Sequence, residues 1–249
     1  MIQKQIVIDD HLINYYQTGT QTAAPAVVFL HGWQSNAQAW VGVLNHMDCQ
    51  ALALDLPGFG QSPRPRTDWG VGDYAELVKS FLAKLQLSHV VLVGHSFGGR
   101  ITIKLAAANP GLVKTLVLVD AAGFRNNSLS RTLKIWSAKI LKPLFELGPF
   151  KALKPRLYEL IGASDYGQAG QLKSILIKTL NEDLSADMRR ITVPTVLVWG
   201  DEDFVSPLSF AERMHKLIPQ SEVKILKNAG HFSFIDQPEQ FLAIIQKLT

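Results

Sequence analysis

The sequence predicts an α/β fold, in which helices cover both faces of a mostly parallel sheet. Two observations predict it. Short apolar runs recur along the chain, and stretches with helical spacing lie between most of them. Continuous apolar runs of this length are typical of strands that are covered on both faces. The expected strands are residues 26–30, 51–56, 90–94, 116–120, 195–200 and 223–226.

The chain starts with a different pattern. Residues 3–9 and 12–18 alternate apolar with polar side chains, which predicts two half-buried antiparallel strands around a turn at residues 9–11. Together with the apolar runs they give a sheet of about eight strands. The same stretch has neither the apolar region nor the small-residue cleavage site of a secretory signal. No apolar run reaches the roughly 18 to 20 residues that span a bilayer.

Three helices are expected over residues 73–87, 206–219 and 236–248, each with an apolar stripe and a start signal. The start signals are Asp73 with Glu76, Ser206 with Pro207, and Asp236 with Glu239.

Residues 121–191 interrupt the alternation, because they contain helical patterns broken by prolines and no convincing strand. A structureless loop of that length is uncommon in a compact domain. We therefore expect an inserted helical cap over residues 121–191, placed at the carboxyl ends of the strands, and a core domain formed by residues 1–120 and 192–249. Ligands of open α/β sheets bind at that edge.

Composition limits the partners and the cofactors. The formal net charge is +4 and no basic stripe interleaved with aromatic residues is visible, so no nucleic-acid partner is expected. Cys49 is the single cysteine, which excludes an intramolecular disulfide and favours a reducing compartment. The seven histidines show no spacing typical of metal ligands. We expect a cytoplasmic protein with no membrane partner, no metal and no cofactor.

The segment Gly94-His95-Ser96-Phe97-Gly98 lies where an expected strand ends and a helical pattern begins. This context makes G-x-S-x-G a nucleophile elbow, in which Ser96 adopts a sparsely populated backbone conformation so that its hydroxyl points up from the sheet. The flanking glycines leave room for the neighbouring chain. Ser96 is therefore the candidate nucleophile.

A serine hydroxyl needs a base within hydrogen-bond reach and an acid that orients the base. His231, in the loop after the last strand, is the expected base, whereas His215 falls inside a helix. Asp203, which follows the strand at residues 195–200, is the expected acid. Asp120 is a rival, because it also ends a strand at the carboxyl edge and lies between Ser96 and His231.

Two backbone N–H groups are expected to form an oxyanion hole. One belongs to Phe97, the residue after the nucleophile, and the other to Trp33 in the loop HGWQSN. The aromatic side chains expected to line a substrate pocket are Trp33, Phe124, Trp136, Phe145, Phe204 and Phe232. For those in the cap, packing of the cap onto the core is the favoured alternative, and the cap lysines and arginines are expected to form a solvated helix face.

Five motifs together resemble the α/β-hydrolase fold family, specifically its capped serine hydrolases of carboxylesterase type. They are HGW (31–33), DLPGFGQS (55–62), GHSFGG (94–99), GDEDFVSP (200–207) and AGHF (229–232). The resemblance implies that Asp203, framed by Gly200 and Pro207, is the acid and that Asp55 is structural.

The same resemblance implies hydrolysis of a small ester or lactone through an acyl-enzyme, without a metal or cofactor, by a monomer or homodimer. Carbon–carbon bond hydrolysis of dienoic acids is a variant with the same triad. Epoxide opening and halide displacement are disfavoured, because those relatives carry aspartate at the elbow. A ligand receptor on the same fold is the alternative outside enzymes.

Overall fold

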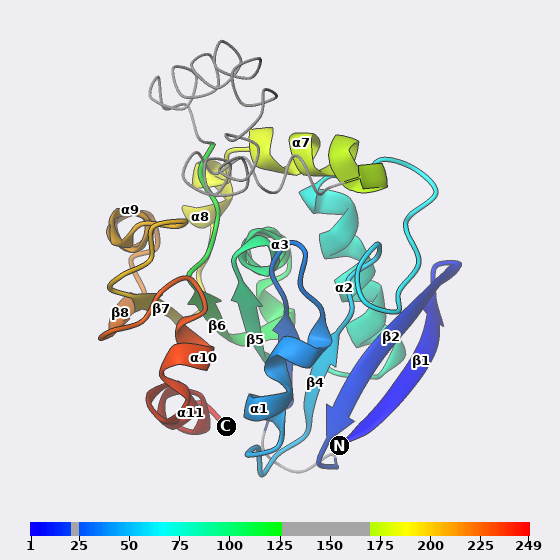
Figure 1. Cartoon of the computed structure of the whole chain (residues 1–249), viewed down its shortest axis with the longest axis horizontal. Coiled ribbons are helices and arrows are strands. Elements are labelled where there is room, and N and C mark those ends of the chain that lie inside the picture. Colours follow the sequence, from blue (N-terminus) through cyan, green and yellow to red (C-terminus); the bar gives the residue numbers. More distant parts are fainter. Residues whose placement is uncertain (21–24, 126–169) are drawn as a thin grey trace, which may run out of the picture.

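The computed structural model describes residues 1–20, 25–125 and 170–249. Within them, eight strands form one sheet in the order β1-β2-β4-β3-β5-β6-β7-β8 (Figure 1). β1 pairs antiparallel with β2 and β2 antiparallel with β4, and every other pair is parallel. The expected sheet of about eight mostly parallel strands is confirmed. The strands are β1 (Ile2–Ile8), β2 (His11–Thr18), β3 (Val27–Leu30), β4 (Ala51–Leu54), β5 (Val90–His95), β6 (Val113–Val119), β7 (Thr195–Gly200) and β8 (Ser221–Leu226).

β1 and β2 form the expected hairpin. Ile8 pairs with His11, so Asp9 and Asp10 form a two-residue turn. Both have positive φ, 45° and 63°, which is the conformation that the right-handed twist of a hairpin requires. Aspartate tolerates this region better than most residues other than glycine.

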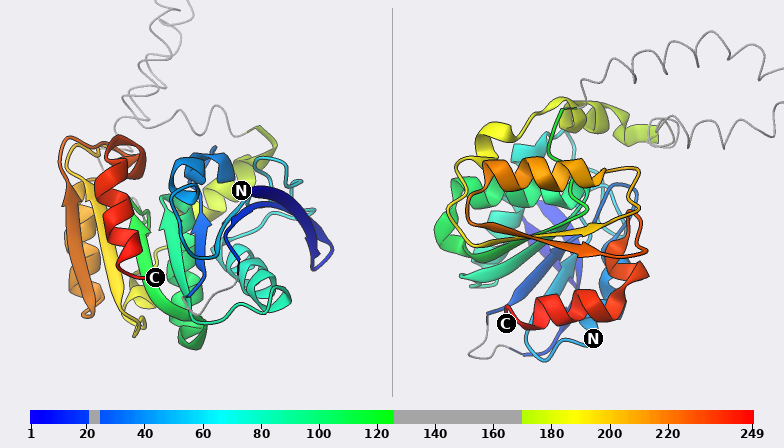
Figure 2. Two further views of the ribbon diagram at one scale, coloured as in Figure 1. Left: turned by 90° about the horizontal axis from the view of Figure 1, so that it is seen from below. Right: turned by 90° about the vertical axis from the view of Figure 1, so that its left-hand side faces the viewer.

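Helices lie on both faces of the sheet (Figure 2). In β3, Val28 and Leu30 pack in one apolar cluster, whereas Val27 and Phe29 pack in the other, because successive strand residues point to opposite faces. The first cluster includes residues of α2 (Val71–Lys84), α3 (Phe97–Ala108) and α9 (Leu208–Leu217). The second includes residues of α1 (Val41–Leu44), α10 (Ser233–Asp236) and α11 (Pro238–Gln246). The sheet is therefore the middle layer of three.

The three expected helices begin at other residues than predicted. α2 begins at Val71, and the Asp73 carboxylate accepts the N–H of Gly70 at 2.6 Å from within the first turn. α9 begins at Leu208 with Pro207 as its N-cap residue, and the backbone N–H of Ser206 donates to Asp203 Oδ1. α11 begins at Pro238, and Asp236 ends the short helix α10 instead.

Residues 126–169, most of the expected cap, lie outside the described residues. The described part of residues 121–191 includes α7 (Lys173–Asn181) and α8 (Ser185–Met188). Arg100 of α3 contacts both described pieces of this range, since its guanidinium donates to the carbonyl oxygens of Phe124 at 2.9 Å and Glu182 at 2.8 Å. The division into core and cap stays a prediction. Of the helices that the structure describes, none combines the length and apolarity needed to cross a membrane.

Candidate active site

Ser96 lies between β5 and α3 with φ 50° and ψ −108°, a strained conformation for a residue with a side chain. The glycines on either side of Ser96 have no space for a side chain. A Cβ atom on Gly94 would lie 2.6 Å from the carbonyl oxygen of Gly98, and one on Gly98 would lie 2.5 Å from that of Leu30. The Ser96 N–H donates to the carbonyl oxygen of Val119 at 3.1 Å. The elbow is thus held by tight packing and by the end of β6.

The side chains of Ser96, His231 and Asp203 form one hydrogen-bonded chain. His231 Nε2 lies 3.1 Å from Ser96 Oγ, and His231 Nδ1 lies 2.9 Å from Asp203 Oδ2. The Asp203 side chain is 0% exposed and the His231 side chain is 15% exposed. The structure therefore brings together three groups that lie far apart in the sequence.

Asp203 has little freedom to turn. Its Oδ1 accepts the backbone N–H groups of Val205 at 2.8 Å and Ser206 at 2.9 Å. These two bonds leave Oδ2 aimed at His231, and since a carboxylate oxygen accepts, His231 Nδ1 donates to it.

The loops that carry Asp203 and His231 pack directly on each other. A side chain on Gly200 would collide with the carbonyl oxygens of Ala229 and Gly230, so only glycine fits at the end of β7. The Gly230 N–H donates to Asp236 at 2.8 Å, which fixes the loop just before the histidine.

Asp120, the rival acid, has other partners. Its Oδ1 accepts the Gly200 N–H at 2.9 Å, and its Oδ2 accepts both the N–H of Ser233 at 3.0 Å and its hydroxyl at 2.6 Å. Burial raises the pKa of Asp120 to about 7, against the effect of these hydrogen bonds. Asp120 thus ties the beginning of the Asp203 loop to the residues just after His231. Sequence reasoning missed this role, although a buried aspartate at a strand end was the signal for it.

The loop after β3 approaches the nucleophile. A Cβ atom on Gly32 would lie 3.2 Å from Ser96 Cβ. His31 is buried and anchors the loop, since its Nδ1 donates to the Gly32 carbonyl at 2.7 Å and its Nε2 accepts the Leu56 N–H at 3.0 Å. Burial lowers the pKa of His31 to about 4, so the ring is neutral at physiological pH.

The two predicted oxyanion donors belong to the residues that follow Gly32 and Ser96, namely Trp33 and Phe97. Phe97 is the first residue of α3, where backbone N–H groups have no partner within the helix. Among the described residues, neither its N–H nor that of Trp33 donates a hydrogen bond.

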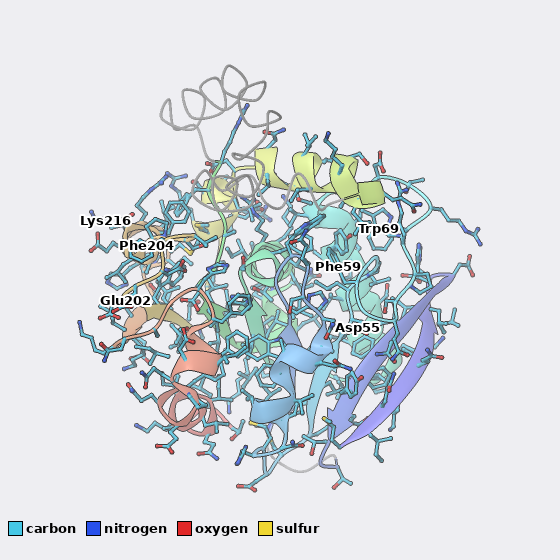
Figure 3. The ribbon with its side chains drawn as sticks, in the orientation of Figure 1. Asp55, Phe59, Trp69, Glu202, Phe204 and Lys216 are labelled. Carbon is cyan, nitrogen blue, oxygen red and sulfur yellow. The ribbon has the colours of Figure 1, made fainter. Side chains whose placement is uncertain are left out.

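The predicted pocket residues lie in different environments. The Trp33 ring packs edge-on against Phe59 and Phe97, at centroid distances of 4.9 and 5.3 Å. Phe124 is buried beneath Arg213, whose guanidinium carbon lies 3.7 Å from the ring centroid. Phe232 is 41% exposed, and Phe204 is 91% exposed at the periphery of the molecule (Figure 3). Trp136 and Phe145 lie outside the described residues.

Asp55, expected to be structural, and two other polar residues, His215 and Asp201, have local partners. The Asp55 carboxylate accepts the backbone N–H groups of Ala37 at 2.7 Å and Gln61 at 2.8 Å, which joins two loops. His215 Nδ1 lies 2.9 Å from Ser221 Oγ, and Asp201 pairs with Lys227 at 3.3 Å. In the described ranges, no group of three or more potential ligands is placed to hold a metal ion.

Comparisons with known proteins agree with this architecture. The model of the Alpha/beta hydrolase family matches residues 27–244. The AB hydrolase superfamily protein YisY of Bacillus subtilis is 29% identical over 90% of this chain and 91% of its own length. Among solved structures, a bacterial membrane phospholipase A has a TM-score of 0.79 at 27% identity, covering 99% of this chain and 85% of its own. The esterase EaEST of Exiguobacterium antarcticum has a TM-score of 0.77 at 25% identity, covering 99% and 98%.

Proposed function

The chain belongs to the alpha/beta hydrolase family, and on that premise we propose that it is a serine hydrolase of carboxylic esters with small acyl groups. The observation that carries the proposal is the hydrogen-bonded chain from Asp203 through His231 to Ser96. A carboxylate, an imidazole and a hydroxyl in this order activate serine as a nucleophile on several unrelated folds. The similarity to an esterase and a phospholipase supports ester bonds as the substrate class.

The reaction follows from the geometry. Ser96 Oγ attacks the ester carbonyl while His231 Nε2 takes the hydroxyl proton, and Asp203 stabilises the resulting imidazolium. The N–H groups of Trp33 and Phe97 bind the oxyanion. His231 then returns the proton to the leaving alcohol as the carbon–oxygen bond breaks. Water, deprotonated by the same imidazole, hydrolyses the acyl-enzyme and restores the Ser96 hydroxyl.

The test is release of nitrophenol from esters of increasing acyl length by the wild type and by Ser96→Ala. We expect Ser96→Ala to lose at least about 1,000-fold in kcat, because the nucleophile is absent. A second variant, Ser209→Ala, changes an exposed serine of α9 and should keep the wild-type rate. Release by the wild type that does not exceed release by Ser96→Ala would contradict the proposal and favour a ligand receptor.

Lactones and dienoic acids belong in the same panel. A wild type that opens lactones or cleaves dienoic acids faster than any ester, with the same dependence on Ser96, would keep the triad chemistry and replace the proposed substrate class.

A further inference from the structure

His95 is a buried polar side chain for which the proposed reaction has no use. It ends β5, immediately before Ser96, and is 2% exposed. Its ring lies among aromatic neighbours, with centroid distances of 5.0 Å to Phe232 and 5.2 Å to Phe234. Burying a polar ring in apolar surroundings costs free energy unless its nitrogen atoms are hydrogen-bonded. The contacts of the two ring nitrogens therefore indicate what His95 does.

One nitrogen contacts the loop of the proposed base. His95 Nε2 lies 2.7 Å from the backbone carbonyl oxygen of His231. A carbonyl oxygen can only accept, so Nε2 carries a proton and donates it. Burial, followed by the nearby His231, lowers the pKa of His95 to about 3. The ring is therefore neutral, with its single proton fixed on the side of His231.

The other nitrogen faces the loop of the proposed oxyanion donor. A Cβ atom on Gly32 would lie 2.8 Å from His95 Nδ1 and 3.1 Å from Cε1, so the backbone of Gly32 lies against the ring. Gly32 is bonded directly to Trp33. The His95 imidazole thus contacts both the Gly32 loop and the His231 loop, and the His95 backbone is bonded directly to Ser96.

We propose that His95 is a positioning residue, which sets the distance between Ser96 Oγ and His231 Nε2 through its hydrogen bond to the His231 carbonyl and its contact with Gly32. This inference rests on the proposed serine hydrolase function. His231 lies outside any helix or strand, so its position depends on such loop contacts. Without the donor, the carbonyl loses its partner and the loop shifts to reach another one. A displacement of about 1 Å in reacting groups can lower a rate about 100-fold.

The experiment compares His95→Leu, His95→Gln and His95→Asn with the wild type by kcat, KM and melting temperature. His95→Leu should lower kcat about 30-fold to 100-fold and leave KM within about threefold, because the change affects the reacting groups. His95→Gln should keep kcat within about fivefold, because its amide N–H can reach the His231 carbonyl. His95→Asn is too short to reach it and should resemble His95→Leu.

Phe81→Leu is the matched control for lost packing. Phe81 is fully buried and packs on Tyr15, and it belongs to α2, which contains none of Gly32, Ser96 and His231. The Phe81→Leu substitution should lower the melting temperature and leave the kcat of the folded enzyme unchanged. If His95→Leu does not fold, the comparison of His95→Gln with His95→Asn decides.

Three outcomes overturn the inference. The first is a wild-type kcat in His95→Leu or His95→Asn. The second is a loss in His95→Gln as large as in the variants that lack the donor. The third is a loss of kcat in Phe81→Leu equal to that in His95→Leu, which would make the effect one of general stability. Nitrophenol release by the wild type and by Ser96→Ala is measured before any His95 variant. If the two do not differ, the proposed function itself is overturned.

Discussion

The substitution Asp203→Asn replaces one carboxylate oxygen atom by an amide nitrogen. It tests whether the Asp203 carboxylate orients His231, the proposed base. The surroundings decide which way the new amide points. Oδ1 of Asp203 accepts two backbone N–H groups, from Val205 and Ser206. Asparagine has a single acceptor oxygen, and it must stay at this position to keep both bonds. Its NH₂ group then faces His231 Nδ1.

The magnitude follows from the tautomer of the histidine. An NH₂ group facing Nδ1 favours the form of His231 that has its proton on Nε2, and this form cannot accept a proton from Ser96. Turning the asparagine over would restore the right tautomer but would lose two hydrogen bonds worth about 1 kcal/mol each and bring the NH₂ group against two N–H donors. We therefore expect kcat to fall about 1,000-fold to 10,000-fold, or about 4 to 5.5 kcal/mol in activation free energy.

The assay is steady-state nitrophenyl ester hydrolysis at pH 7.5, with circular dichroism to establish that the variant folds. Asp120→Asn is the matched control. Asp120 is the rival carboxylate, but its hydrogen bonds go to Ser233 and Gly200 rather than to His231. It should keep kcat within about tenfold. Full activity in Asp203→Asn would refute the choice of acid, and a large loss confined to Asp120→Asn would transfer the role to Asp120.

Two further predictions concern stability. In the folded protein the pKa of His95 is lowered from 6.5 to about 3. The neutral ring therefore contributes fully to the free energy of unfolding above about pH 6.5, and this contribution is lost as the pH falls toward 3. From pH 7.5 to pH 5, the free energy of unfolding measured in urea should therefore fall by about 2 kcal/mol more in the wild type than in His95→Gln. An equal fall in both proteins would mean that the His95 ring is charged in the folded state. Gly98→Ala places a Cβ atom 2.5 Å from the Leu30 carbonyl oxygen and should lower the melting temperature by about 6 to 12 °C. Gly111→Ala, whose added Cβ meets nothing within 4 Å, should change it by less than about 2 °C.

The strands were predictable because each is a local pattern. The run at 195–200 coincides with β7 and the run at 90–94 with most of β5, since burial on both faces requires continuous apolar residues. The helix starts were less predictable. Ser206 and Asp236 were expected to start helices, but the backbone N–H of Ser206 donates to Asp203 Oδ1 and the Asp236 carboxylate accepts the Gly230 N–H. Both partners lie within six residues along the chain, but whether a polar group caps a helix or contacts a loop depends on how those loops fold, so the start signal alone did not place the helix.

The sequence by itself determined the alternation of strand and helix, the serine at a turn between them, and the short set of histidines and carboxylates that could serve it. The tertiary structure decided which carboxylate faces the histidine, because Asp203 and Asp120 both follow strands that end at the same edge and their hydrogen bonds distinguish them. It also assigned His95 its two contacts, one with the loop of His231 and one with that of Gly32. The physical reason is that a strand pattern depends on neighbouring residues, whereas the direction of a side chain at a loop depends on segments that only folding brings together.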